Sequence, residues 1–144
     1  MKIRKATALD AARLAEIETR QPMSAQWGEK GFASEVRHSA SAVWCAEEGG
    51  AVQGFAAFRQ AAGFCELLNL AVDPAYARRG FAFVLLKHAL TELRGLGVQT
   101  VSLEVNYKNV AAIGLYLKLG FEEKGRRKKF YHGTDDALIM GMDL

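Results

Sequence analysis

The stretch from residue 64 to residue 106 constrains the fold more than any other part of the chain. A strand-like run, FCELLNLAVDP, is followed by a helix-periodic run, FAFVLLKHALTELR, and then by an alternating run, TVSLEVN. A helical connection returns the chain in its original direction, so the two strands are expected to be parallel neighbours in one sheet. This unit predicts an α/β protein with a mixed sheet and helices packed on it.

The remaining patterns predict five more strands and three more helices. The strands are expected at residues 2–7, 42–48, 51–60 and, as a long hairpin turning near 132–136, over 121–144. The helices are expected between a cap at Thr7 or Asp10 and Pro22, within 24–39, and over 109–120. The predicted order is β-α-α-β-β-β-α-β-α-β-β, and a chain of 144 residues fits a single domain.

Basic side chains are concentrated in one short segment. Residues 124–130, KGRRKKF, contain five of the nineteen Lys and Arg residues, whereas the formal net charge of the whole chain is only +3. Such a segment is either a solvated hairpin face or a surface that attracts an anionic ligand or a ribonucleoprotein. No aromatic platform or RNA-binding signature accompanies it, so direct nucleic-acid binding is not expected.

The cysteines and the hydropathy indicate a cytoplasmic protein without a metal site. Cys45 and Cys65 lie in apolar strand-like runs, with no CxxC pair and no histidine at ligand spacing, so buried thiols are expected. The first ten residues, MKIRKATALD, lack the apolar core of a signal peptide. No apolar stretch approaches the roughly 20 residues that cross a bilayer, so no membrane partner is expected.

The junction between the strand-like run and the helix, RRGFAF at residues 78–83, is the first candidate site. A helix that starts after Arg79 presents unpaired N–H groups and a positive dipole end, which favour an anion. Gly80 allows close approach to the backbone, and Arg78 and Arg79 add positive charge. The pattern fits either an ordinary helix start or a binding turn for phosphate.

This junction resembles motif A of the GNAT acyltransferases. The stretch NLAVDPAYARRGFAFVLL matches that motif, with Gly80-Phe81-Ala82 where Gly-Leu-Gly is commoner, a departure that bears on cofactor affinity rather than on the fold. The resemblance implies a GNAT acyl-CoA N-acyltransferase fold over a single domain, residues 1–144, with acetyl-CoA as cosubstrate. The residues then implied to surround its pyrophosphate are Arg78, Arg79, Gly80, Phe81, Ala82 and Phe83.

Three further stretches are similar to the RimI-type protein N-terminal acetyltransferases of this family. They are SLEVNYKNVAAIGLYLKLGF, RRKKFYHGTDDALIM and QWGEKGFASEV, the last with Gln26 where that group has proline. The resemblance implies acetyl transfer to the N-terminal α-amine of a protein, an alanine-initiated small-subunit ribosomal protein. Trp27 and Tyr131 are then implied to line the peptide groove; the alternatives are a core anchor for Trp27 and simple hairpin packing for Tyr131.

Acetyl transfer to an amine requires a proton acceptor for the amine and a proton donor for the departing thiolate. The alternation of TVSLEVN places Glu104 on the polar face of its strand, and Tyr116 follows in the next helix. The resemblance assigns these roles to the same residues, Glu104 as proton acceptor and Tyr116 as proton donor. A solvent-facing glutamate and a half-buried core tyrosine are the ordinary alternatives.

The resemblance also implies cofactor contacts outside the turn. Asn109, which is a candidate N-cap, is implied to hydrogen-bond the cofactor. The strand over 64–72 is implied to splay from its neighbour, leaving backbone groups of Leu70, Ala71 and Val72 free for pantetheine and the thioester oxygen. Two other functions stay open, which are acetyl transfer to a lysine or small-molecule amine and a noncatalytic CoA-binding or ribosome-associated module.

Overall fold

The computed structural model describes residues 1–144 and contains the predicted elements in the predicted order. The strands are β1 (Lys2–Lys5), β2 (Ser41–Glu48), β3 (Ala51–Ala61), β4 (Phe64–Val72), β5 (Thr100–Asn106), β6 (Glu122–Tyr131) and β7 (Asp135–Asp143). The α-helices are α1 (Ala11–Thr19), α2 (Gly28–Glu35), α3 (Phe81–Gly95) and α4 (Val110–Leu119). None of these helices is long and apolar enough to span a bilayer.

All seven strands form one sheet in the order β1-β2-β3-β4-β5-β7-β6. β4 and β5 are parallel, and every other neighbouring pair is antiparallel. The strand–helix–strand unit therefore forms the parallel pair that the sequence predicts, with α3 as its connection. The mixed α/β class is confirmed.

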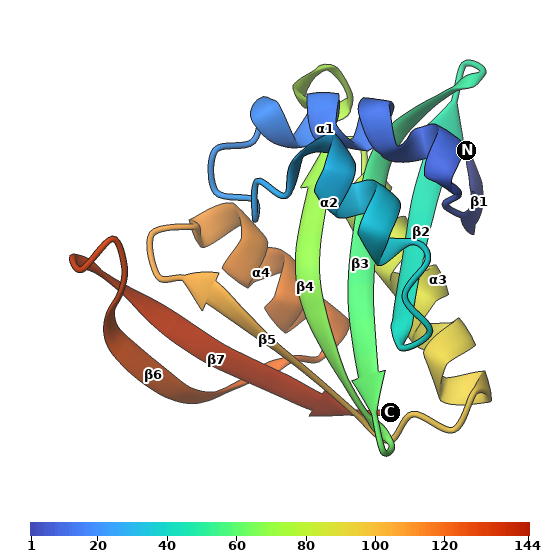
Figure 1. The fold of residues 1–144 in the computed structure, drawn as a ribbon. Helices are drawn as coiled ribbons and strands as arrows, with labels where there is room; N and C mark the ends of the chain where they lie inside the picture. Colours follow the sequence, from blue (N-terminus) through green and yellow to red (C-terminus); the bar gives the residue numbers. More distant parts are fainter.

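The parallel pair is hydrogen-bonded over less than half of the length of β4. Residues Phe64–Leu67 of β4 pair with Thr100–Leu103 of β5, and the two strands then separate. β4 continues to Val72 beside β3, while β5 continues to Asn106 beside β7, so the sheet opens into a V (Figure 1). The splay expected from the family resemblance is present, and it leaves one edge of β4 without a strand neighbour.

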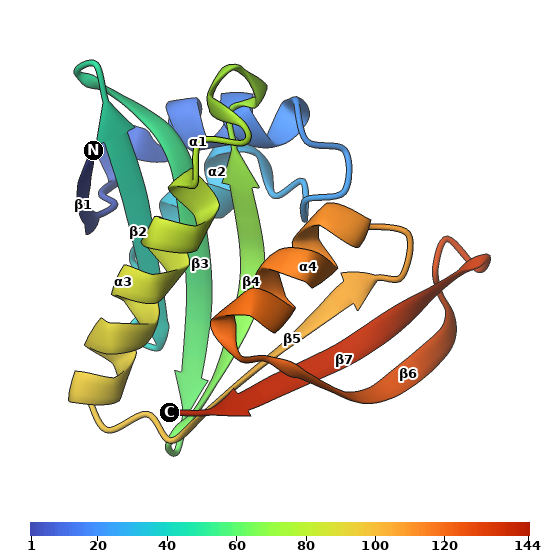
Figure 2. The ribbon, with the colours of Figure 1, turned by 180° about the vertical axis from the view of Figure 1, so that it is seen from behind.

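Helices cover both faces of the sheet and create two separate cores. α1 and α2 lie on one face (Figure 1), and α3 and α4 lie on the other (Figure 2). Phe55 and Ala57 of β3 pack under α1 and α2, whereas Ala56 and Phe58 pack on the opposite face. Because β3 is buried on both faces, its sequence is a continuous apolar run rather than an alternating one.

The two cysteines lie on opposite faces of the sheet. Cys45 belongs to the core under α1 and α2, and Cys65 belongs to the core under α3 and α4. Both are buried free thiols, as predicted, and burial raises the pKa of each to about 11. No group of three or more His, Cys, Asp or Glu side chains is arranged to hold a metal ion.

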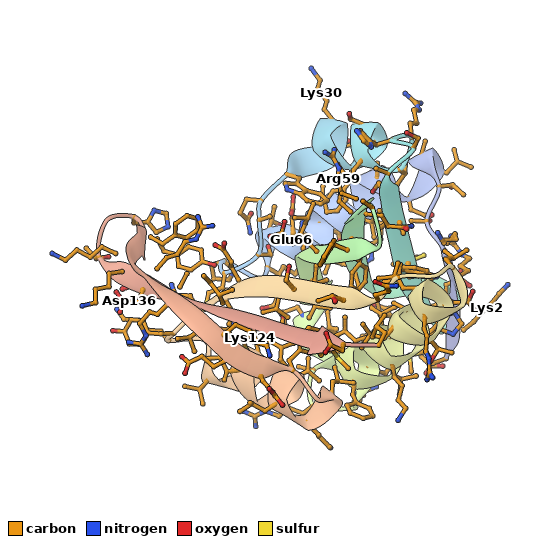
Figure 3. All side chains as sticks on the ribbon, turned by 90° about the horizontal axis from the view of Figure 1, so that it is seen from below. Lys2, Lys30, Arg59, Glu66, Lys124 and Asp136 are labelled. Atoms are coloured by element: carbon orange, nitrogen blue, oxygen red, sulfur yellow. The ribbon has the colours of Figure 1, made fainter.

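The predicted C-terminal hairpin, β6 and β7, forms the far edge of the sheet. Figure 3 shows Asp136 near its outer end and Lys124 nearer the body of the molecule. Three of its cationic side chains face carboxylates: Lys124 pairs with Glu122 at 3.5 Å, Arg126 with Asp136 at 3.2 Å and Arg127 with Glu104 at 3.1 Å. Much of the basic charge in residues 124–130 is thus compensated locally.

Asp73 ties the exit of β4 to α1. Its buried carboxylate accepts hydrogen bonds from the Ala75 N–H at 3.0 Å and from the guanidinium groups of Arg13 at 2.9 Å and Arg20 at 3.3 Å. The Ala75 N–H and the Arg13 guanidinium lower the pKa of the Asp73 carboxyl below its ordinary value. Because the pKa is lower in the folded chain than in the unfolded chain, ionised Asp73 stabilises the fold.

We expect Asp73→Asn to lower the free energy of unfolding by roughly 1–3 kcal/mol at neutral pH, the usual effect of losing charge-assisted hydrogen bonds. The contribution of the carboxylate is lost as the pH falls through its lowered pKa, so the difference between variant and wild type should shrink below pH 3.8, its ordinary pKa. Urea unfolding across that range measures both effects. The exposed Glu123→Gln is the control and should unfold like the wild type; a loss for Asp73→Asn that does not change with pH would contradict this role.

Candidate active site

A cavity of about 610 Å³ lies where β4 and β5 separate. Its walls come from both splayed strands, the N-terminal end of α3, one face of α4, the hairpin residue Tyr131 and the loop between α1 and α2. The predicted site residues that line it are Leu70, Ala71, Val72, Arg78, Gly80, Phe81, Ala82, Phe83, Glu104, Asn109, Tyr116 and Tyr131. The splay of the sheet therefore brings nearly all of the candidate residues to one place.

The turn at residues 78–83, here called the phosphate turn, fits a phosphate group. α3 begins at Phe81 after Gly80, which has φ 78°, a left-handed conformation that suits glycine. A Cβ built on Gly80 meets nothing within 4 Å, so the backbone faces open space. The first bond of the helix runs from the Val84 N–H to the Gly80 carbonyl, so the preceding N–H groups have no partner within the helix.

The two arginines of the phosphate turn lie differently. Arg78 lines the cavity and has φ 63°, which turns the chain sharply before the helix. Arg79 is not among the lining residues, and its guanidinium carbon lies 4.9 Å from the centre of the Tyr76 ring. Arg79 therefore stacks on Tyr76, and it is Tyr76 that lines the cavity.

Glu104 also lines the cavity, from the part of β5 that no longer pairs with β4. The alternation predicted for this strand is present, because Val101, Leu103 and Val105 are buried and Glu104 is only partly buried. The Glu104 side chain is 20% exposed, and its carboxylate forms an ion pair with the Arg127 guanidinium at 3.1 Å. The carboxylate thus reaches the cavity from β5, and the Arg127 guanidinium of the hairpin balances its charge.

Tyr116 and Tyr131 complete this part of the cavity. Tyr116 is 6% exposed, and its ring packs edge-on against Phe121 at 5.7 Å. Burial, together with the neighbouring Tyr131, raises the pKa of the Tyr116 hydroxyl far above its ordinary value, so this group stays protonated. Burial and the charge of Glu104 raise the pKa of Tyr131 as well. A carboxylate and a protonated phenol therefore face one cavity.

The remaining cofactor candidates also line the cavity. Asn109 is the N-cap of α4, as predicted, and its side chain accepts a hydrogen bond from the Ala112 N–H at 3.3 Å. Leu70, Ala71 and Val72 line the cavity from β4. The carbonyl of Val72 already accepts a hydrogen bond from the Gln21 side chain at 2.7 Å.

Trp27 is not among the residues that line the cavity and packs instead against the core under α1 and α2. Its ring packs on Phe32 at 5.3 Å, and Phe32 in turn packs on Phe55 at 5.0 Å in the core under α1 and α2. The loop residues that line the cavity are Gln21, Met23, Ser24 and Ala25. Trp27 thus anchors the end of the loop to the core.

Sequence reasoning missed Gln21, Asn69 and Arg127. Gln21 lies in an irregular loop, where no periodicity indicates its direction. Asn69 had a signal, because it is the one polar residue within the apolar run LLNLAV, and it proves to be 4% exposed and to line the cavity. The pairing of Arg127 with Glu104 depends on the order of β5, β7 and β6, which no local pattern predicts.

A splayed mixed sheet, a glycine turn at a helix start, and a carboxylate and a phenol on one cavity are typical of acyl-CoA-dependent N-acyltransferases. The GNAT acetyltransferase family model matches residues 10–121, and the chain belongs to this family. Members of the family use acetyl-CoA, and the open backbone at Gly80 fits its pyrophosphate.

Relatives with assigned names are similar over most of the chain. The [ribosomal protein bS18]-alanine N-acetyltransferase of Escherichia coli strain K12 is 39% identical over 121 residues, covering 82% of this chain and 81% of that protein. The N-alpha-acetyltransferase RimI of Mycobacterium tuberculosis is 34% identical over 143 residues, covering 95% and 89%. The crystal structure of the Escherichia coli ribosomal-protein-S18-alanine N-acetyltransferase superposes with a TM-score of 0.86 at 34% identity, covering 99% of this chain and 92% of that one.

We expect Gly80→Glu to weaken acetyl-CoA binding strongly, because the new carboxylate would occupy the phosphate turn and repel the pyrophosphate. Titration calorimetry with acetyl-CoA should show a loss of at least about tenfold in affinity. Gly80→Asn is the control, since asparagine tolerates the left-handed backbone and carries no charge; it should bind more tightly than the glutamate variant. Wild-type affinity in Gly80→Glu would place the cofactor elsewhere.

Proposed function

We propose that this protein transfers the acetyl group of acetyl-CoA to the N-terminal α-amine of another protein, an alanine-initiated small-subunit ribosomal protein. The observation that carries this proposal is a single cavity that extends from the phosphate turn to Glu104 and Tyr116. The names of the relatives at 39% and 34% identity support the acceptor. The proposed setting is the cytoplasm, where ribosomal proteins are made.

The proposed chemistry assigns one proton transfer to each end of the reaction. The amine nitrogen attacks the thioester carbonyl carbon, and Glu104 takes the proton that the amine must lose. A C–N bond forms and the C–S bond breaks. Tyr116, which burial keeps protonated, gives its proton to the departing sulfur. Backbone N–H groups on the open edge of β4 are proposed to stabilise the oxyanion that forms in between.

An α-amine suits a site with one carboxylate as its base. Its reference pKa is about 7.7–8.0, against about 10.4 for lysine, so a larger share of the α-amine is already neutral near pH 7. The Arg127 guanidinium lies 3.1 Å from the Glu104 carboxylate, so the proposed base lies beside the hairpin. These features favour an N-terminal acceptor over a lysine side chain.

The proposed acceptor path lies between the hairpin and the loop that joins α1 to α2. Tyr131 lines the cavity on one side, and Gln21, Met23 and Ser24 line it on the other. In this proposal Tyr131 contacts the peptide directly, and Trp27 acts through the loop that it anchors. An extended N-terminus entering there would present its α-amine to Glu104.

We expect Glu104→Gln to lower kcat by about 10²–10⁴-fold, the usual contribution of a general base, with little change in acetyl-CoA affinity. Tyr116→Phe should lower kcat at neutral pH and by a similar factor near pH 9.5, because the raised pKa keeps the wild-type hydroxyl protonated at both values. Steady-state rates with an alanine-initiated peptide, measured by CoA release, test both variants.

Arg127→Gln is the control for Glu104→Gln, because it removes the ion pair and keeps the carboxylate. It should retain far more activity than the Glu104 variant. Wild-type turnover in Glu104→Gln and Tyr116→Phe would contradict both assignments. If the difference in kcat between Tyr116→Phe and the wild type disappears near pH 9.5, the Tyr116 hydroxyl ionises below that pH.

We expect acetylation of an alanine-initiated peptide at its α-amine, at a rate far above that of the same peptide with a blocked terminus and a free internal lysine. Mass spectrometry identifies the acetylated position. Tyr131→Ala should raise the KM for the peptide and leave the KM for acetyl-CoA nearly unchanged. Equal rates on the free and blocked peptides would instead indicate a lysine or small-amine acetyltransferase, and CoA binding without turnover would indicate a noncatalytic module.

A further inference from the structure

Glu18 is a buried carboxylate that the proposed chemistry does not use. It lies near the C-terminal end of α1, its residue is 1% exposed, and no Lys or Arg side chain forms an ion pair with it. Its Oε1 accepts a hydrogen bond from the Gly28 N–H at 2.6 Å, and its Oε2 accepts one from the Asn69 Nδ2 at 3.1 Å. A buried carboxylate is costly, so its two donors must compensate for the lost hydration.

Asn69 extends this arrangement across to the splayed strand. It lies on β4 beyond Leu67, the last residue that pairs with β5, and it lines the cavity. Its Oδ1 accepts a hydrogen bond from the Ala25 N–H at 3.2 Å, while its Nδ2 donates to Glu18. A continuous chain of three hydrogen bonds therefore runs from the Gly28 N–H through Glu18 and Asn69 to the Ala25 N–H.

The segment held at both ends of this chain is the loop between α1 and α2. The loop has no regular structure between Thr19 and Gly28, and Gln26 has φ 60°. Two further hydrogen bonds join the loop to α1 and to β4. The Gln26 side chain donates to the Glu18 carbonyl at 2.7 Å, and the Gln21 side chain donates to the Val72 carbonyl at 2.7 Å. The conformation of the cavity wall at Ala25 thus depends on two buried polar side chains.

We propose that Glu18 and Asn69 are positioning residues for the acceptor, which set the α1–α2 loop against the open edge of β4. The inference rests on the proposed function, because it assigns this loop to the acceptor side of the cavity. Neither side chain takes part in the proton transfers. Their contribution is to hold the wall residues Gln21, Ser24 and Ala25 at a fixed distance from β4, the strand whose open edge is proposed to bind the thioester of acetyl-CoA.

The direction of the hydrogen bonds provides a specific test. In Glu18→Gln the new amide offers a donor to the Asn69 Nδ2, which is itself a donor, and flipping Asn69 only moves the mismatch to the Ala25 N–H. In Asn69→Asp two carboxylates face each other. In the double variant Glu18→Gln/Asn69→Asp the amide and the carboxylate exchange places, so all three hydrogen bonds are again possible and the pair still carries one negative charge.

We expect each single variant to raise the KM for an alanine-initiated peptide by about tenfold or more, because a buried donor or acceptor is left unpaired beside the loop. The KM for acetyl-CoA should change little, since the hydrogen bonds of this pair go to the α1–α2 loop and none goes to the phosphate turn. The double variant should restore the peptide KM to near the wild-type value. Amide hydrogen exchange at Ala25 and Gly28 should be fast in the single variants and slow in the wild type and the double variant.

Glu35→Gln is the matched control. Glu35 is also a largely buried carboxylate of the α1–α2 layer, but it pairs with Arg59 at 2.9 Å and does not line the cavity. Its substitution should lower the melting temperature and leave the peptide KM unchanged. If the Glu18 and Asn69 variants behave in the same way, the pair is structural only and the proposal is wrong.

Two further outcomes are decisive. If the single variants do not fold, the double variant decides, because a folded double variant with a raised peptide KM or fast exchange at Ala25 overturns the proposal. A wild-type protein that binds acetyl-CoA but acetylates no α-amine peptide would contradict the proposed function itself, and the acceptor role of this pair with it.

Discussion

The separation of β4 from β5 is the constraint on which the rest of the structure depends. The two strands share hydrogen bonds only between residues 64–67 and 100–103, and each then follows a different neighbour. A sheet that stayed paired to its ends would bury the backbone of residues 68–72 in a ladder and would leave no room between α3 and α4. By opening, it exposes main-chain groups on one edge of β4 and places a helix N-terminus and a strand carboxylate on the same cavity.

Both sides of the opening are stabilised by groups outside the regular ladders. On the β5 side, the hairpin supplies an ion pair between Arg127 and Glu104 at 3.1 Å. On the β4 side, the loop from α1 supplies hydrogen bonds to Val72 and Asn69. An unpaired strand edge is normally a liability, because its polar groups attract other strands. Here side chains and the loop cover part of that edge while the remainder faces the cavity.

The sequence predicted the element order and the site better than the contacts within the site. Apolar runs, local periodicity and turn residues together predicted every helix and strand, and the strand–helix–strand unit required the parallel pair. Glu104 and Tyr116 were accessible to sequence reasoning because alternation and helix phase fix their direction once the fold is known. Three contacts were not predictable from short patterns. The pairing of Arg127 with Glu104 depends on the long-range register of the strands. The burial of Glu18 and the packing of Trp27 on Phe32 depend on the irregular segment between α1 and α2.

The placement of the two thiols allows cysteine labelling to report when either helical layer separates from the sheet. Cys45 and Cys65 lie on opposite faces of the sheet, one beneath each pair of helices, and both are buried with a pKa of about 11. A thiol reagent added to the native protein would meet few accessible thiolates, so the signal in a CoA-release measurement belongs almost wholly to the product. Over longer times, the rates at which the two cysteines are labelled would report separately how often each helical layer lifts from the sheet.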